Sequence, residues 1–342
     1  MRPISAVDAV SLAIQRTRDF LFRPFNWGTF LKLGLVAIVT EGLGSNLHSS
    51  SDNSSHSSGH GPMINSPFDI PPVWIAAAVA MVLLLILFSM VVAYLVTRLR
   101  FAFFHCLIHN TKEIQPGWRL YSNQATRFFW LNVVVGFCFL LLIALIAIPF
   151  VAGFVRVFHQ MTEIGHPDWG LVLSLVLPLL PIILLLALAG IALDVILRDW
   201  MLPHYALEDA TAGEAWSSVW ARITAEKRQF LVYALLRLIL PTLATIAAFM
   251  VLAIPGLILA ASVAVVEWGL HSAFSDATGG SALTGILLQV FFGFLAFVFM
   301  LLASICLGGP LSTGTREYAL LFYGGRYKAL GDILYPPVPR SA

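Results

Sequence analysis

The sequence predicts an all-α membrane protein, a bundle of about six transmembrane helices with interfacial amphipathic helices. Of its 342 residues, 59% are hydrophobic and only 11% are charged, and the mean hydropathy is +0.86. Soluble domains carry about 25% charged residues, so this chain cannot cover a water-facing surface. The 25 residues from Val73 to Thr97 carry no charge. They would form roughly 37 Å of helix, against a hydrocarbon core of about 30 Å.

Six apolar segments are the expected spans. The first is the weakest, because Lys32 and Glu41 lie within it. The fifth is too long for one straight span, but the part that follows Pro255 is short for a second crossing. The segments run near Trp27–Gly44, Pro72–Thr97, Phe128–Phe158, Trp169–Ile196, Phe230–Val266 and Thr284–Leu307.

The distribution of lysine and arginine predicts the orientation. With six spans and the N-terminus inside, the outside loops near 45–71, 159–168 and 267–283 contain neither residue. Arg156, near the outer end of the third span, is the one exception. The positive-inside rule therefore predicts six spans with both termini in the cytoplasm.

Charged residues inside the spans have two interpretations. Lys32 and Arg237 lie a few residues into their spans. Their long side chains either reach back to the inner interface or face a polar cavity within the bundle. Asp194 and Arg198 are spaced to pair along one helix face, which is ordinary structural chemistry.

Matching residues predict an internal repeat. Leu99-Arg100 and Leu197-Arg198 follow long apolar segments 98 residues apart, and Trp118 and Trp216 share that spacing. Each unit would consist of an amphipathic cytoplasmic helix, a kinked span, an outside loop and a second span. The chain would be a single integral membrane domain, 1–342. Its parts would be repeat-like units 1–98, 99–197 and 198–310, a disordered outside loop 45–70, and a cytoplasmic tail 311–342 with a further interfacial helix, Thr313 to Phe322.

Amphipathic helices are expected at the inner membrane surface. Ser5-x-x-Asp8 and Thr211-x-x-Glu214 are helix-capping signatures. Basic and aromatic residues flank these helices, which suits the membrane interface. The apolar stripe of the first helix is Val7, Val10, Ile14, Thr17 and Leu21. The predicted lipid or interface anchors are Arg16, Arg18, Trp118, Arg119, Arg127, Trp216, Lys227 and Arg228.

Prolines within the spans bend their helices, because each removes a backbone hydrogen bond. Pro149 and Pro255 end the matching runs Ala-Ile-Pro late in the third and fifth spans. Such kinks serve either packing or a transport path, and Pro149, Pro255 and Arg237 are the residues expected at a kink or cavity. The midplane lacks the ionisable groups that ion-coupled transporters carry.

No strong pattern indicates a metal, a cofactor or catalysis. His48, His56 and His60 lie with Asp52 in a low-complexity Ser/Gly loop, which is typical of a disordered linker more than of a metal site. Nucleophile, P-loop and dinucleotide-binding motifs are absent. We expect no cofactor and no nucleic-acid partner. Two short polar clusters on the inner side, which a lipid-active enzyme could use, are His105, His109 and Glu113, and His204, Glu208 and Asp209.

Short motifs along nearly the whole chain resemble an uncharacterised prokaryotic membrane-protein family of unknown function. The motifs are Ala6-Val7-Asp8-Ala9, Leu21-Phe22-Arg23-Pro24-Phe25, Arg198-Asp199-x-x-x-Pro203 with Glu214-Ala215-Trp216, and Pro310-x-x-x-x-x-Arg316-x-Tyr318. The layout is similar to the membrane domain attached to some glycerophosphodiester phosphodiesterases. This chain lacks their soluble catalytic domain, so the resemblance does not imply their activity. It implies a bacterial or archaeal plasma membrane.

The sequence therefore predicts a non-enzymatic integral protein that interacts with lipids or acts as a scaffold. Its partners would be membrane lipids and, through the small residues Gly256, Ala260 and Ala264, a second copy of itself. The alternative is a transporter or flippase for a small or lipid-like solute. A polar pocket in the bundle would favour transport, and a sealed apolar centre would favour the first reading. A metal or a close histidine–carboxylate pair at the inner interface would favour a lipid-active enzyme.

Overall fold

The computed structural model describes residues 4–46, 72–164, 169–274 and 280–335. These residues form helices and no strand, so the predicted all-α fold is confirmed. Five of the helices are long and apolar enough to cross a membrane. The five stretches are Val73–His109, Ser122–Val157, Val172–Leu207, Lys227–Leu270 and Leu283–Gly324.

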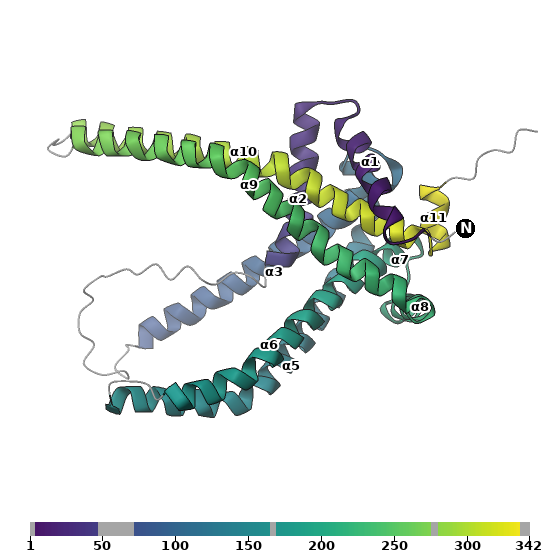
Figure 1. Cartoon of the computed structure of the whole chain (residues 1–342), viewed down its shortest axis with the longest axis horizontal. Helices are drawn as coiled ribbons and strands as arrows, with labels where there is room; N and C mark the ends of the chain where they lie inside the picture. Colours follow the sequence, from purple (N-terminus) through teal and green to yellow (C-terminus); the bar gives the residue numbers. More distant parts are fainter. Residues whose placement is uncertain (1–3, 47–71, 165–168, 275–279, 336–342) are drawn as a thin grey trace, which may run out of the picture. The chain divides into compact units, whose positions relative to one another are not determined.

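Shorter helices are interspersed with the long ones along the chain (Figure 1). The long helices are α2 (Trp27–Asn46), α3 (Pro72–His109), α5 (Ser122–Ile164), α6 (Trp169–Val195), α9 (Lys227–Phe274) and α10 (Gly280–Gly324). The shorter ones are α1 (Asp8–Phe22), α4 (Gln115–Leu120), α7 (Leu202–Leu207), α8 (Ala212–Ala225) and α11 (Lys328–Leu334). A π-helical segment, Ile196–Met201, joins α6 to α7.

The structure has one long apolar helix fewer than the six predicted spans, counted over the described residues. α2 has nearly the predicted bounds but is not among the five. The polar side chains of Lys32 and Glu41 make it less apolar than the others. In addition, Leu33, Ala37 and Thr40 are buried inside the protein, so much of its surface packs on other helices.

The chain divides into two compact units that alternate along the sequence. Unit 1 consists of Met1–Val10, Tyr121–Leu236 and Ala319–Ala342. Unit 2 consists of Ser11–Leu120 and Arg237–Tyr318. The long helices α9 and α10 each contribute to both units, because the boundaries fall within them.

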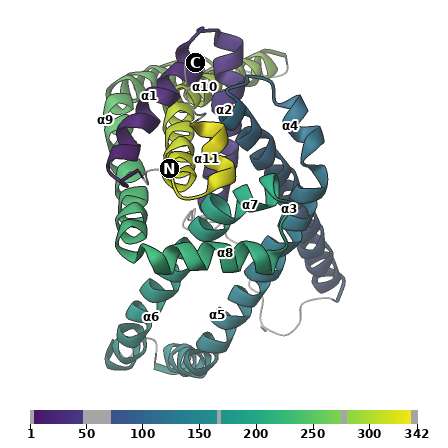
Figure 2. The same cartoon turned by 90° about the vertical axis from the view of Figure 1, so that its right-hand side faces the viewer.

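In unit 1, buried side chains gather where the apolar helices begin and end. α5 and α6 run side by side (Figure 1). The core contains Phe128 near the start of α5, Tyr205 beyond the end of α6, Tyr233 near the start of α9 and Tyr323 at the end of α10. α7, α8 and α11 come together at this end of the unit (Figure 2).

In unit 2, α2 lies against the ends of α3 and α10. A Cβ atom placed on Gly309 of α10 would be 2.7 Å from the Cα atom of Gly34 in α2. Arg100 Nε of α3 donates to the carbonyl oxygen of Thr40 at 3.0 Å. α2 therefore packs beside the C-terminal parts of α3 and α10.

The most apolar windows of these stretches are largely uncovered by protein. Only 0% to 6% of the residues in each window are buried inside the protein. α3, α5, α9 and α10 contain 38, 43, 48 and 45 residues. Such helices measure about 57 to 72 Å, roughly twice the hydrocarbon thickness. Each helix is therefore long enough to leave the bilayer and to end in a protein core.

The predicted apolar stripe of α1 is only partly buried. Thr17 and Leu21 are buried as expected, but Val7 and Ile14 are 63% and 64% exposed. The predicted separate helix Thr313 to Phe322 is the last part of α10, which runs through Pro310. It is buried in the core and does not lie at the surface.

The predicted helix starts are confirmed. The backbone N–H of Asp8 donates to Ser5 Oγ at 3.1 Å, where α1 begins. At the start of α8, Thr211 and Glu214 form both halves of a capping box. Each cap satisfies backbone donors that the first helical turn leaves without partners.

Gly309→Ala should destabilise the protein by about 1–3 kcal/mol, the usual cost of forcing extra volume into a packed contact. The new methyl group would meet the backbone of Gly34, which cannot move aside alone. Gly136→Ala is the matched control, because nothing lies within 4 Å of a Cβ atom there. Thermal unfolding in detergent measures both variants, and equal unfolding temperatures would contradict the contact between α2 and α10.

Candidate functional site

A buried histidine joins two helices in unit 1. His204 of α7 is 1% exposed. Its Nδ1 lies 3.0 Å from Glu208 Oε2, and its Nε2 lies 2.7 Å from the hydroxyl oxygen of Tyr323 in α10. Since a carboxylate only accepts, Nδ1 carries the proton and donates to Glu208, and Nε2 accepts from Tyr323. The predicted neighbours His204 and Glu208 are thus paired, and Tyr323 completes the cluster.

Arg222 of α8 lies against this cluster. Its Nη1 donates to the carbonyl oxygen of Ser218 at 2.9 Å and lies 3.3 Å from His204 Nε2. The guanidinium carbon is 5.2 Å from the ring centroid of Tyr327 and 5.9 Å from that of Tyr323. The ion pairs of the described residues include none with Arg222. Neutral groups therefore hold this cation in place.

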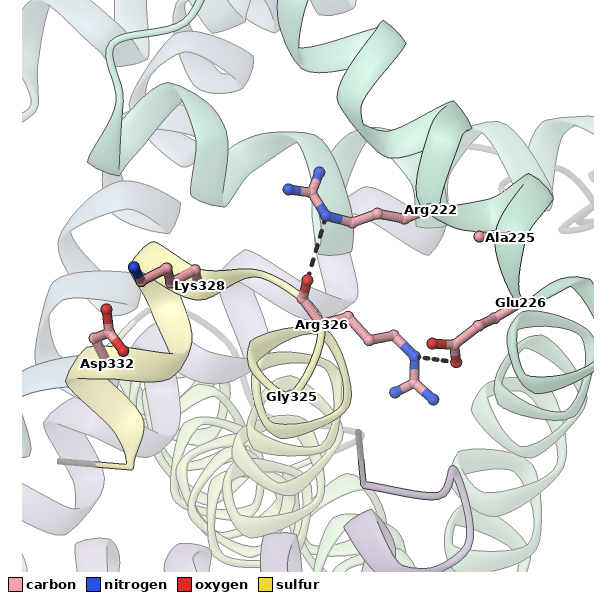
Figure 3. A pocket seen from close by; sticks show the side chains of 7 residues that line it. All are labelled: Arg222, Ala225, Glu226, Gly325, Arg326, Lys328 and Asp332. Carbon is pink, nitrogen blue, oxygen red and sulfur yellow. Dashed lines mark hydrogen bonds and ion pairs between the residues drawn. The ribbon is translucent and has the colours of Figure 1, made fainter. Parts of the chain in front are cut away.

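A groove of about 570 Å³ opens beside Arg222 (Figure 3). Arg326 Nε lies 2.8 Å from Glu226 Oε2, and its Nη1 donates to the carbonyl oxygens of Ile4 and Phe322 at 3.0 Å each. The Arg326 side chain is 4% exposed, so it holds the turn after α10 together. The groove is lined by Arg222, Ala225, Glu226, Gly325, Arg326, Lys328 and Asp332.

Two ionisable groups at the edge of the cluster have shifted pKa values. Burial acts to raise the pKa of Glu208, but hydrogen bonds with His204 and Tyr327 and the charge of Arg222 outweigh it and lower the pKa. Burial raises the pKa of the Tyr327 hydroxyl, and its contact with the Glu208 carboxylate raises it further. Glu208 is therefore ionised and Tyr327 neutral near pH ~7.

The π-helical segment before α7 carries buried charges. Arg198 Nη1 lies 3.5 Å from Asp194 Oδ2, so the predicted pair is confirmed. Asp199 is 0% exposed and accepts a hydrogen bond from the hydroxyl of Tyr233 at 2.8 Å. π-Helical turns occur often at functional sites, where they insert an extra residue into a helix. Here the segment leads directly into α7 and His204.

Unit 2 buries two ion pairs. Arg16 Nε lies 3.2 Å from Glu317 Oε2, and Arg16 Nη2 donates to the carbonyl oxygen of Leu107 at 2.9 Å. Arg237 Nη2 lies 3.1 Å from Glu41 Oε2, with side chains 13% and 8% exposed. Removing one partner of a buried pair costs about 3–5 kcal/mol, because the other charge stays buried. These pairs therefore fix α1 to α10 and α2 to α9.

In unit 1, α8 presents two tryptophans outward. Trp216 and Trp220 are 41% and 52% exposed, and their ring centroids lie 6.1 Å apart in a stacked arrangement. The buried residues of α8 lie elsewhere on the helix. α9 begins directly afterwards with the exposed residues Lys227 and Arg228. Aromatic rings and basic side chains thus gather at the polar start of an apolar helix.

Unit 2 has a similar set at the connection from α1 to α2. Phe22, Phe25 and Trp27 are 42%, 47% and 62% exposed. The ring of Phe25 lies 6.1 Å from that of Phe22 and 5.1 Å from that of Trp27, measured between centroids. Arg18 and Arg23 are exposed in the same stretch of chain. We call this set and that of Trp216, Trp220, Lys227 and Arg228 the aromatic–basic edges.

Five of the predicted lipid anchors have exposed side chains. They are Arg18, Arg119, Trp216, Lys227 and Arg228. Arg127 is also exposed, but its Nη1 lies 2.9 Å from Asp209 Oδ1, so a carboxylate offsets its charge.

Two predicted anchors contact protein instead. Arg16 contacts protein, because Glu317 and the carbonyl of Leu107 hold its guanidinium. Trp118 is half-buried, and the guanidinium carbon of Arg98 lies 4.7 Å from its ring centroid. An arginine over an indole face is a favourable cation–π arrangement.

The residues expected at a kink or cavity line no part of the groove. Pro149 and Pro255 are exposed within α5 and α9, which continue through them. Arg237 pairs with Glu41.

Among the described residues, no group of three or more His, Cys, Asp or Glu side chains is arranged to hold a metal ion. His48, His56 and His60 of the predicted outside loop lie outside those residues. His105 and His109 have ring centroids 4.5 Å apart. Cys106, Cys138 and Cys306 are free thiols, of which Cys106 is buried, Cys306 half-buried and Cys138 exposed.

Comparison with protein families identifies the group to which the chain is related. Residues 4–333 match the Family of unknown function (DUF7544). The chain belongs to this family. Searches of curated proteins and of solved structures found no match. Membership of the family confirms the predicted kinship with a family of unknown function. The predicted likeness to the membrane domain of glycerophosphodiester phosphodiesterases stays a prediction.

Sequence reasoning missed the groove and the buried carboxylates. The sequence patterns did not single out Arg222, Arg326 or Glu317. One local signal was available for the carboxylates. Arg198-Asp199 and Arg316-Glu317 are adjacent basic and acidic residues that follow long apolar runs. Charges so close to a membrane segment need partners, which indicates a buried polar core.

Glu208→Gln should remove a stabilisation that is present at neutral pH and absent in acid. The folded pKa of Glu208 is lowered from the usual 4.5, so its carboxylate stabilises the protein above that value and the effect is lost as pH falls through the folded pKa. Thermal unfolding from about pH 7 to about pH 3 measures this for wild type and variant. The two unfolding temperatures should converge in acid.

Glu113→Gln, at an exposed glutamate of unit 2, is the matched control and should follow wild type throughout. A difference between Glu208→Gln and wild type that stays constant across this pH range would contradict the assigned interactions.

Proposed function

We propose that this protein binds anionic lipids of a bacterial inner membrane at the polar ends of its apolar helices, without catalytic activity of its own. The aromatic–basic edges carry the proposal. In each unit they combine exposed rings with exposed lysine or arginine where an apolar helix begins. Tryptophan and phenylalanine favour the headgroup depth of a bilayer, and basic side chains there attract anionic headgroups.

The histidine–carboxylate pair gives little support to an enzyme. His204 is 1% exposed, and both ring nitrogens already have protein partners, Glu208 on one side and Tyr323 with Arg222 on the other. A general base needs a free position within reach of a substrate proton. The pair is better suited to holding Arg222 and Tyr323 in position. The groove lies beyond the apolar stretches, so it gives the transport alternative no support either.

We further propose six crossings with both termini in the cytoplasm. Lys112 Nζ donates to the carbonyl oxygens of Arg23 and Pro24 at 3.3 and 2.8 Å. Both ends of the chain between Pro24 and Lys112 therefore lie together in unit 2, and the chain between them crosses the bilayer an even number of times. The stretch from Val73 supplies one crossing, so the segment between Pro24 and Val73 supplies another.

The same reasoning supports a repeat of outgoing and returning helices. Arg127 near the start of α5 pairs with Asp209, which follows α7. Asn110 and Asp209 follow returning helices and have positive φ angles of 54° and 49°. Arg100 and Arg198 are 98 residues apart, whereas Asn110 and Asp209 are 99 apart. The π-helical segment inserts one residue between Arg198 and Asp209, which accounts for the difference.

Self-association stays part of the proposal. Nothing lies within 4 Å of a Cβ atom placed on Gly256, so the small-residue ridge that it begins is not used within the chain at that point. A second copy could pack closely there.

Reversal of Arg18, Arg119, Lys227 and Arg228 to glutamate should reduce the anionic lipid that the protein retains. Each basic residue near an anionic leaflet contributes about 1 kcal/mol, so retention of phosphatidylglycerol should fall severalfold. The measurement is the ratio of phosphatidylglycerol to phosphatidylethanolamine in polymer nanodiscs excised from cells. An unchanged ratio would sink the proposal.

Arg156→Glu is the matched control for this variant. Arg156 is exposed in α5 but lies about 44 Å along the helix from Arg127, far from the basic end. Its reversal should leave the lipid ratio unchanged.

Six crossings also predict a pattern of labelling by a membrane-impermeant maleimide. In a background without the three native cysteines, Val73→Cys and Ser272→Cys should be labelled in intact cells. Gln15→Cys and Asn123→Cys should be labelled only after the membrane is opened. All four positions are exposed, so accessibility reports the side of the membrane. Labelling of Gln15→Cys in intact cells would contradict the topology.

A further inference from the structure

Arg222 is a half-buried cation without an ion pair among the described residues. Taking a guanidinium out of water is unfavourable unless an anion compensates its charge. Arg326 in the same groove has such a partner, Glu226, at 2.8 Å. Arg222 instead donates to the carbonyl oxygens of Ser218 and Arg326, the latter at 3.4 Å. Glu208 is near enough to feel its charge but bonds to His204.

The buried cluster fixes the guanidinium of Arg222 in one orientation. His204 Nε2 lies 3.3 Å from its Nη1, and the rings of Tyr327 and Tyr323 lie close to its carbon. Figure 3 shows the bond from Arg222 to the Arg326 carbonyl at the edge of the groove. A cation that is already fixed loses little conformational entropy when an anion binds. The buried cluster would therefore hold Arg222 in the orientation that a bound anion needs.

A second cation lies in the same groove. Lys328 begins α11, and its side chain is exposed. Asp332, four residues later, is exposed as well, and an exposed pair of this kind is only weakly stabilising. Glu226 already pairs with Arg326, so Arg222 and Lys328 are the cations of the groove that can bind an incoming anion. Its volume of about 570 Å³ also leaves room for an organic group attached to the anion.

A phosphate group fits these two cations better than a carboxylate does. A phosphate carries more negative charge and more acceptor oxygens than a carboxylate, so separate oxygens can accept from the guanidinium of Arg222 and from the ammonium of Lys328. Ala225 and Glu226 line the groove, and Lys227 and Arg228 of the aromatic–basic edge follow directly in the chain. A lipid headgroup at that edge would lie next to the groove.

We propose that the groove between α8 and α11 binds a phosphate group through Arg222 and Lys328, carried by an anionic lipid or free in solution. This deepens the proposed function by naming the chemical group that is recognised, and it rests on that function for the lipid source. The aromatic–basic edges attract anionic lipids in general. The groove selects an accessible phosphate.

The test is thermal unfolding of the full-length protein in phosphatidylcholine nanodiscs, with two probes. Inorganic phosphate is titrated into one set, and phosphatidic acid is built into the other at increasing fractions. A ligand that binds the folded state raises the unfolding temperature. A rise with phosphatidic acid alone indicates a lipid headgroup, and a rise with inorganic phosphate indicates a free phosphate.

Arg222→Gln and Lys328→Gln should each shift the half-maximal concentration of the active probe upward by about tenfold, as expected for loss of one charge-assisted contact. Arg156→Gln, at an exposed arginine near the far end of α5, is the matched control and should respond as wild type does. Should Arg222→Gln fail to fold, Lys328→Gln still carries the test, because its side chain is exposed. Arg222→Lys should give an intermediate half-maximal concentration, since it keeps the positive charge and loses the planar guanidinium group.

Absence of a response to both probes in wild type would overturn the inference, and so would wild-type affinity in both variants. The outcome is separable from that of the proposed function. The surface variant with Arg18, Arg119, Lys227 and Arg228 reversed keeps Arg222 and Lys328. Its unfolding temperature should still rise with the probe that stabilises wild type. If that variant loses lipid retention while wild type responds to neither probe, the phosphate site is contradicted. The proposed lipid binding is then still supported.

Discussion

The need to pair buried charges governs the ends of the long helices. A helix of 48 residues such as α9 is far longer than a bilayer is thick. The part beyond the hydrocarbon must either stay in water or pack against other helices. Here it packs, and it carries charge into the core. Glu317 and Asp199 are both 0% exposed, and each has a partner from another helix, Arg16 and Tyr233.

This arrangement places the chemistry of the protein at the polar ends of its helices. In unit 1 the cluster of His204, Glu208 and Tyr323 lies behind Arg222, and Arg222 faces a groove. The most apolar windows of the long helices contain hardly any buried side chains, which suits contact with lipid. A protein built in this way can recognise molecules at the membrane surface without a path through the bilayer. Lipid binding follows more naturally from it than transport does.

Sequence reasoning succeeded where the interaction is local. The capping residues Ser5 and Thr211 and the pair of Asp194 with Arg198 depend on spacing within one helix, so the pattern of residues reveals them. The pairing of Arg16 with Glu317 depends on which helix ends meet, and no short-range pattern encodes that. The first predicted span shows the same limit. Glu41 made that segment the weakest of the six by hydropathy, but its charge is paired with Arg237 of α9, and hydropathy carries no information on such a pairing.

Quenching of single tryptophans by brominated lipids tests most directly whether the helices leave the bilayer and end in protein. Variants would each keep one of the nine tryptophans. Trp74 lies in the apolar stretch of α3 and is 69% exposed, so bromine in the acyl chains should quench it strongly. Trp200 lies in the π-helical segment that follows α6, is 4% exposed and packs 4.9 Å from the ring of Phe230, so it should stay bright at every bromine depth. Quenching of Trp200 as strong as that of Trp74 would mean that lipid surrounds the helix end, and it would contradict the account.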